Sequence, residues 1–417
     1  MTRDRWIALI RDRLIFVKIA VVILWLSWLI MMASTGFRRD IEGKPIGTDH
    51  MAFFTAARFI DEGRGTSIYD NKAVGDYQTA LTGSEGWLLD AYRNPPFYAL
   101  AYVPSARLPY LASFWIWSVI GLLLLWFGIK WLGSAKPVSA FVLAFSFYPV
   151  FAVLSFGQNS LLSFGFFALT FYAMSRKRFV LAGMASGLLL FKPQLLMGLG
   201  LWWLLSIRTY WKCFVGLGIT GALLAAISFL MVPEETKVFV EKLPEIGRYS
   251  AFMFWNLHNP RGFGTLVAWD DKHIGNIVGF VCLGLGALCF GWFWLRHRGN
   301  LPVMFAAAVY FTLWGSPHTM IYEWSIAVIP AVLLWENVKD KRDDWFLVFS
   351  VCWVALFIST PIAKGLFEWT WDGKKGWAIQ ISVPVLAVVA VWTARVLRSS
   401  GTAGGIVREL GPTTVVH

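Results

Sequence analysis

Long apolar runs alternate with short basic or polar segments along most of the chain. An upright helix needs about 20 apolar residues to cross a bilayer, and most of the runs approach that length. The pattern predicts an all-α polytopic membrane protein with about 12 transmembrane helices. The predicted spans are residues 15–35, 110–131, 137–155, 159–174, 179–191, 195–207, 213–232, 276–296, 301–316, 321–336, 345–362 and 377–397.

Two neighbouring predicted spans, 179–191 and 195–207, are unusually short and are separated by Lys192-Pro193-Gln194. A helix of about 13 residues covers only about 20 Å. Both outer flanks of this pair are basic, so both are expected on the cytoplasmic side. We therefore predict a hairpin of two short helices, with Lys192 at its apex below the outer surface of the membrane.

The pattern is interrupted by two long polar stretches, residues 34–108 and 233–274, which we expect on the outer side of the membrane. In the first, the segment 51–69 carries Phe53, Ala56, Ala57 and Ile60 at helical spacing, and glycines at 63 and 65 end the pattern, which predicts an amphipathic helix lying in the membrane interface. Residues 1–400 are expected to form one membrane-embedded domain. The tail at 401–417 is expected to be cytoplasmic and disordered, and both termini are predicted to lie in the cytoplasm.

Composition agrees with a membrane protein. Hydrophobic residues make up 57% of the chain and charged residues 15%, whereas soluble domains carry about 25% charged residues. The formal charge of +12 does not indicate nucleic-acid binding, because the Lys and Arg residues fall into short clusters between apolar runs. The 4 cysteines all lie in apolar segments and lack the paired spacing of a metal site or disulfide framework.

The segment Gly47-Thr48-Asp49-His50 follows the first span at the expected boundary between membrane and water. Asp49 is the earliest carboxylate that could reach the outer side of the membrane domain. Its position before a predicted helix also suits an N-cap, so capping and catalysis are both open. Adjacent helical residues diverge by about 100°, so His50 either contacts a substrate or points elsewhere.

Several short motifs occur in an order that resembles the GT-C class of integral-membrane glycosyltransferases, in particular the polyprenol-phosphate-mannose-dependent alpha-mannosyltransferase-like family. The motifs extend over most of residues 1–335. They are the segment from Asp49 to Asp70, Arg93-Asn94-Pro95-Pro96-Phe97, Val103-Pro104, Leu108-Pro109, Gly157-Gln158-Asn159, Gly183 to Lys192-Pro193-Gln194, and Ser316-Pro317-His318.

This resemblance implies a role for Asp49 as general base. An inverting transfer needs a carboxylate to take the proton from the acceptor hydroxyl as that hydroxyl attacks the anomeric carbon. We expect Asp49 to be ionised near water and to serve without a large pKa shift.

The resemblance also implies a lipid-phosphate sugar donor, whose leaving phosphate is stabilised by basic groups. The candidates for that role are Lys192, Arg93 and His318, with Arg261 weaker. Lys192 could instead be a snorkelling interface lysine, and His318 could serve in helix capping or packing.

Three further polar residues are candidates for substrate binding. Gln158 and Asn159 lie at a predicted outer turn, where their amides either bind sugar hydroxyls or satisfy the backbone. Glu323 either orients His318 or faces the pocket.

Some enzymes of this class use a pair of acidic residues with a divalent ion, and Asp40-x-Glu42 and Asp270-Asp271 have such a composition. No other ligand cluster accompanies them, so we favour a metal-independent reaction with no cofactor and leave a divalent metal open.

The expected function is transfer of a hexose, with mannose favoured, from a polyprenyl-phosphate donor to a lipid-linked or cell-surface glycan acceptor. The site would lie on the extracytoplasmic face of the inner membrane. The alternative is a transporter or flippase of lipid-linked sugars, which would need a polar route across the membrane.

Overall fold

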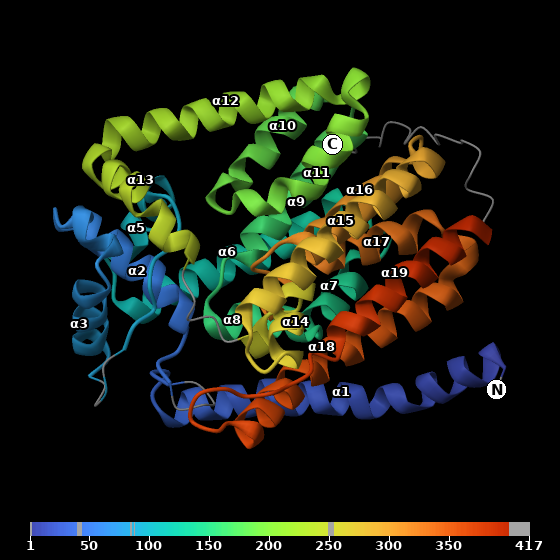
Figure 1. Ribbon diagram of the computed structural model, residues 1–417, viewed down its shortest axis with the longest axis horizontal. Helices are drawn as coiled ribbons and strands as arrows, with labels where there is room; N and C mark the ends of the chain where they lie inside the picture. The colour runs from blue at the N-terminus through green and yellow to red at the C-terminus, as the bar shows by residue number, and fades with distance from the viewer. Residues whose placement is uncertain (1, 40–43, 84–85, 87, 249–253, 400–417) are drawn as a thin grey trace, which may run out of the picture.

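The computed structural model describes residues 2–39, 44–83, 86, 88–248 and 254–399 (Figure 1). In that part of the chain every regular element is a helix, and six helices are long and apolar enough to cross a membrane. They are α1 (Arg3–Ser34), α6 (Tyr110–Trp131), α12 (Ile207–Met231), α15 (Lys272–His297), α18 (Arg342–Thr370) and α19 (Ser382–Ser399). These helices confirm the all-α polytopic membrane fold, whereas the count of 12 spans stays a prediction.

The predicted span at 137–155 is not one straight helix. The segment forms two helices, α7 (Pro137–Phe145) and α8 (Tyr148–Phe156), bent by 67° relative to one another. Pro149 lies in the first turn of α8 and has no N–H to donate to the Phe145 carbonyl, so the helix cannot continue across this point. If the bent pair counts as one span, the described residues contain up to seven spans.

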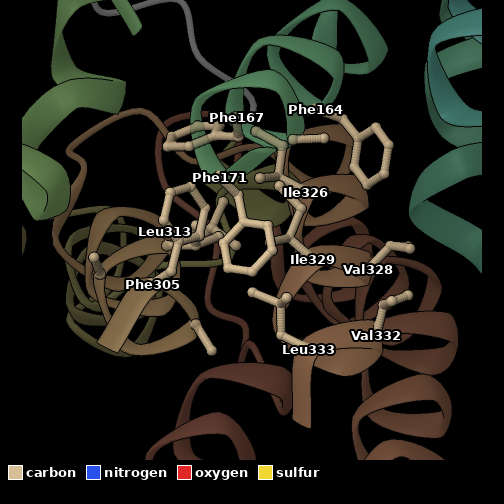
Figure 2. Close-up of a cluster of buried hydrophobic side chains, with 14 of the residues drawn as sticks. Phe164, Phe167, Phe171, Phe305, Leu313, Ile326, Val328, Ile329, Val332 and Leu333 are labelled. Carbon is tan, nitrogen blue, oxygen red and sulfur yellow. The ribbon is translucent and has the colours of Figure 1, made fainter. Parts of the chain in front are cut away.

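The remaining apolar helices are shorter and form the centre of the bundle. They are α9 (Ser160–Ser175), α10 (Phe179–Gly187), α11 (Met197–Leu205), α16 (Leu301–Gly315) and α17 (Val328–Asn337). Figure 2 shows the aromatic rings of α9 packed with Phe305 and Leu313 of α16 and Ile329 of α17, and all these side chains are buried. This apolar packing supplies the rigid base on which the polar residues of the outer end are held.

Short 3₁₀ turns connect several of these helices. They are η2 (Leu188–Phe191), η3 (Pro193–Leu196), η5 (Ile321–Ala327) and η6 (Lys339–Lys341). Lys192 lies between η2 and η3, which is the connection that the hairpin prediction requires. The predicted span at 321–336 begins with η5 and only becomes an α-helix at Val328.

The first outer segment is largely helical. It contains α2 (Thr48–Asp61), η1 (Gly65–Tyr69), α3 (Asn71–Thr82), α4 (Pro96–Leu100) and α5 (Val103–Ala106). Nearly all the side chains of α2 from His50 to Phe59 are buried within the protein, and the position of this helix in the membrane interface stays a prediction. It packs against η1, α4 and α5, and is therefore an interior element of the outer end.

The second outer segment also folds into helices, namely α13 (Pro233–Arg248), η4 (Phe254–Asn256) and α14 (Pro260–Val267). The rings of Tyr69 and Phe239 lie 5.6 Å apart, so α13 packs on η1 of the first segment. Figure 1 shows α2, α3 and α13 together at one end of the molecule, with the N-terminus of α1 at the other. The predicted tail at 401–417 lies outside the described residues.

Candidate active site

The first turn of α2 is held in place by α6. Gly47 precedes it with φ 67, a left-handed conformation that glycine adopts without strain, and a Cβ at this position would overlap the Phe114 ring. The Tyr110 hydroxyl lies 2.6 Å from the Ile46 carbonyl oxygen and 2.7 Å from that of Gly47. α6 therefore fixes the start of α2, and with it the direction in which Asp49 points.

Asp49 does not cap this helix. The N-cap is Gly47, and no side-chain capping hydrogen bond forms. Instead, the Asp49 Oδ2 atom accepts a hydrogen bond of 2.9 Å from Nε2 of Gln158. Gln158 follows Gly157, whose left-handed φ of 69 ends α8, and the turn aims the amide at α2. The capping interpretation of Asp49 is therefore wrong, and its carboxylate is available for another role.

A line of polar contacts continues from Gln158 into the hairpin. The Lys192 ammonium lies 3.5 Å from Gln158 Oε1 and donates a 2.8 Å hydrogen bond to Glu323 Oε1. Glu323 Oε2 accepts from the Met320 N–H at 2.9 Å, which caps η5. We call Asp49, Gln158, Lys192 and Glu323 the Asp49 network. Four elements distant in sequence each contribute one member.

These contacts change what we expected of Gln158 and Glu323. Gln158 Oε1 accepts from the Asn159 N–H at 3.0 Å and faces Lys192, while its nitrogen donates to Asp49. Its amide therefore satisfies a backbone N–H at the turn, as one of our two expectations held, and in addition holds Asp49, while sugar binding stays a prediction. Both Glu323 oxygens are engaged, one by Lys192 and one by Met320, so Glu323 holds Lys192, and a role towards His318 stays a prediction.

Burial changes the acidity of Asp49. Desolvation raises its pKa from 3.8 to about 6, against the lowering effects of the Gln158 hydrogen bond and the Lys192 charge, while Glu323 adds to the rise. The expectation that Asp49 has no large pKa shift is therefore wrong. A base works best when its pKa lies near the operating pH, so this shift makes Asp49 a better general base than an exposed aspartate.

A second carboxylate, Asp90, lies close enough to Asp49 for the two charges to interact. Burial raises the pKa of Asp90 well above its ordinary value, and the Asp49 charge raises it further, while Lys44 lowers it. The Asp90 backbone is held by Gln78, which accepts from its N–H at 2.7 Å and donates to its carbonyl at 2.9 Å. We did not single out Asp90 in the sequence. The only signal there was an acidic residue shortly before the Arg93 motif.

His50 faces the core between α2 and α6. Its Nε2 atom lies 3.1 Å from Ser113 Oγ, and the rings of Tyr102, Tyr110 and Phe114 surround it. Burial lowers its pKa to about 3, so it is neutral. With 1% of its surface exposed, His50 is part of the packing that holds Asp49 and does not offer a surface to substrate.

Arg261 and His318 lie close enough for the Arg261 charge to act on the imidazole. Arg261 Nε donates to Asn276 Oδ1 at 2.8 Å, which directs it towards α15. Burial and the Arg261 charge lower the pKa of His318 to about 4. His318 is therefore neutral at pH 7 and cannot supply the positive charge that we expected it to bring to a phosphate.

For two candidates, Arg93 and Asn159, the predicted roles in binding the substrate stay predictions. Arg93 is half-buried in the irregular segment that precedes α4, and its role towards phosphate stays a prediction. Asn159 is buried near the Tyr98 hydroxyl, yet within the described residues its side-chain nitrogen and oxygen make no hydrogen bond of normal geometry. A buried amide usually has partners, so this one is a candidate for binding substrate.

The acidic pairs considered for a metal give no support for such a site. Asp271 accepts hydrogen bonds from the His273 and Ile274 N–H groups and caps α15. Asp40 and Glu42 lie outside the described residues. Within the described part of the chain, no three His, Cys, Asp or Glu residues are grouped as metal ligands. Metal dependence stays an open prediction.

The arrangement places a carboxylate of raised pKa and a lysine on the same polar network. Such a pair is suited to accepting a proton next to an anionic group.

The family model of glycosyltransferase family 87 matches residues 92–317, more than half of the chain. No curated protein and no solved structure matches the chain significantly. The matched region includes Gln158 and Lys192, while Asp49 and Glu323 lie on either side of it.

Proposed function

This chain belongs to glycosyltransferase family 87, and we propose that it transfers a hexose, mannose, from a polyprenyl-phosphate donor to a lipid-linked or cell-surface glycan acceptor. Family membership supports glycosyl transfer in a multi-pass membrane protein. The observation that carries the finer proposal is the hydrogen bond from Gln158 to Asp49, continued through Lys192 to Glu323.

In this mechanism Asp49 accepts the proton of the acceptor hydroxyl while the hydroxyl oxygen attacks the anomeric carbon. With a pKa of about 6, Asp49 is mostly ionised at pH 7, so it is ready to accept that proton. The Gln158 amide holds the carboxylate in one orientation during the attack. Because the attack comes from the face opposite the leaving group, the transfer inverts the anomeric configuration.

The bond between the anomeric carbon and the phosphate oxygen breaks in the same step, and the polyprenyl phosphate leaves with additional negative charge. Lys192 is the cation that stabilises this charge, with Arg93 and Arg261 as further candidates. Glu323 keeps the Lys192 ammonium oriented, because a single buried cation without a partner would be costly. His318, which is neutral, can contribute at most a hydrogen bond.

We propose that the protein lies in the inner membrane, with Asp49 on the extracytoplasmic side and both termini in the cytoplasm. The basic residues at the start of α1, among them Arg3, Arg5 and Arg11, support this orientation by the positive-inside rule. A flippase would have no need of a general base, and family membership favours transfer over translocation.

The test is Asp49→Asn in the purified enzyme, with synthetic polyprenyl-phosphate-mannose and a lipid-linked glycan acceptor. Loss of a general base lowers turnover by about 10²–10⁴-fold. The matched control is Asp61→Asn on the same helix, where the carboxylate is bound to Arg107 at 2.7 Å near the surface. Solvent screens an exposed pair of this kind, so its loss should leave transfer unchanged.

Two outcomes would contradict the proposal. Turnover by Asp49→Asn close to that of the wild type would exclude Asp49 as the base. Transfer from a nucleotide sugar but not from polyprenyl-phosphate-mannose would exclude the donor while leaving the family assignment intact. Polyprenyl-phosphate-glucose, assayed in parallel, tests the choice of mannose.

A further inference from the structure

A large apolar cavity lies between α1 and the helices α7 and α15 to α19. Its volume is about 1590 Å³, whereas pockets for small molecules are typically about 300–1,000 Å³. Its walls are almost entirely apolar and include Leu143, Phe349 and Val391. In Figure 1, α1 runs along the edge of the bundle on the same side as α18 and α19. A cavity of this size and composition suits hydrocarbon chains.

One end of the cavity is cationic. Arg13 of α1, Lys136 before α7, and Arg395 and Arg398 of α19 all line it. The only acidic residue in the lining, within the described part of the chain, is Glu336. Its Oε1 atom already accepts hydrogen bonds from the Ala135 N–H at 3.0 Å and the Ser134 hydroxyl at 3.4 Å. This one carboxylate offsets only one of the positive charges, so this end of the cavity keeps a net positive charge.

This cationic end lies across the bundle from the Asp49 network. Lys136 precedes α7 and Gln158 follows α8, so the bent pair separates them. In the same way η5 and α17 separate Glu323 from Glu336 by about 25 Å of helix. Arg398 closes α19 at the same end, because it and Arg296, in the last turn of α15, both lie over the Trp292 ring.

We propose that the cavity holds an anionic glycerophospholipid, with its acyl chains between α1 and the bundle and its phosphate at Lys136, Arg395 and Arg398. An apolar void this large would forfeit the dispersion contacts of its walls, so hydrocarbon fills it. The cationic end selects a negative headgroup of the leaflet opposite Asp49. A sugar donor with its phosphate beside Lys192 could place only its tail here, which would leave these cations without an anion.

The experiment is to wash the detergent-purified protein extensively and to identify the retained lipid by mass spectrometry. We expect the wild type to retain an anionic phospholipid. Lys136→Glu with Arg395→Glu should weaken retention by about 30-fold or more, since two attractive charges are replaced by repulsive ones. The matched control is Arg208→Glu with Lys212→Glu, two exposed cations of α12 that do not line the cavity.

A second variant covers the case in which the charge reversal does not fold. Ala331→Trp with Ala390→Trp fills the cavity from two walls and leaves its cationic end intact. We expect this variant also to lose the lipid, and the thermal midpoint of the wild type to be higher in phosphatidylglycerol nanodiscs than in phosphatidylcholine ones. Unchanged retention by every folded variant would overturn the proposal. Retention of a polyprenyl phosphate or a zwitterionic lipid would also overturn it.

Discussion

This protein contains two buried polar clusters that differ in charge. In the Asp49 network, Gln158 links the Asp49 carboxylate to Lys192, and Lys192 in turn binds the Glu323 carboxylate. The second cluster, which we call the His258 cluster, consists of His258, Ser359, Thr360, Gln380 and Ser382. It joins the second outer segment to α18 and α19.

In the His258 cluster the polar atoms of the imidazole are paired with neutral hydroxyls. Nδ1 lies 2.7 Å from Ser382 Oγ and Nε2 lies 2.9 Å from Thr360 Oγ1. Burial lowers the pKa of His258 to about 3, so the ring is uncharged. Trp324 donates to the His258 carbonyl at 3.0 Å, and the cluster thereby holds η5, the element that carries Glu323.

The contrast shows that burial of polar groups does not by itself indicate a catalytic site. The His258 cluster is neutral and internally paired, so it stabilises the fold and has nothing to offer a reactant. The Asp49 network carries formal charges, and one end of it is a half-buried carboxylate of raised pKa. Three single substitutions and one double variant test this distinction.

Of these variants, the largest effects on transfer and stability together are expected for Lys192→Met. We expect transfer to fall by about 10²–10³-fold, because a cation that stabilises the leaving phosphate is lost. The free energy of unfolding should fall by about 3–5 kcal/mol, because Glu323 is left buried without its partner. Transfer assays and chemical denaturation measure the two effects separately.

The double variant Lys192→Met with Glu323→Gln separates stability from chemistry. It removes both charges, so it should recover most of the stability but none of the transfer. If the double variant regained transfer, the role of Lys192 would be structural, and the two clusters would not differ in the way described above.

An intermediate effect is expected for Gln158→Leu. Loss of a hydrogen bond to a charged carboxylate should lower turnover by about 10–100-fold. In the wild type, turnover should fall as the pH falls through about 6, because protonated Asp49 cannot act as a base. The Gln158 hydrogen bond lowers the Asp49 pKa, so its loss should move this acid limb to higher pH.

The pH profile separates orientation of Asp49 from general damage to the fold. Gln194→Leu, in the same hairpin as Lys192, is the control and should keep the wild-type acid limb. An acid limb that stays near pH 6 in Gln158→Leu would argue against the contact between Gln158 and Asp49.

The smallest effect on transfer is expected for His258→Ala. The loss of two hydrogen bonds and of ring volume should lower the free energy of unfolding by about 2–3 kcal/mol. In the folded fraction, turnover and the acid limb near pH 6 should remain those of the wild type. A displaced acid limb would show that the His258 cluster takes part in the chemistry.

Much of the fold was predictable from local pattern. Apolar runs of sufficient length predicted α1, α6, α12, α15, α18 and α19, because a helix that crosses a membrane depends only on its own residues. Lys192-Pro193-Gln194 predicted the break in the hairpin for the same reason. The bend between α7 and α8 was missed, although Pro149 was visible, because apolar residues continue across it.

The candidate site was predictable only in part. Asp49 and Lys192 could be named in the sequence from their positions and from the family resemblance. Gln158 as the group that orients Asp49, Glu323 as the partner of Lys192, and Asp90 as a second carboxylate could not, because their roles depend on contacts between distant segments. The neutral state of His318 was equally hidden, since it follows from burial and from the nearby Arg261.

The sequence by itself determined the membrane class, the main helices and the region in which the polar chemistry lies, because apolar periodicity and charge placement are local properties. Only the tertiary structure decided which polar residues form the site and which form the core. Burial sets the pKa of Asp49 and keeps His50 neutral, and burial exists only when helices from the whole chain have packed together.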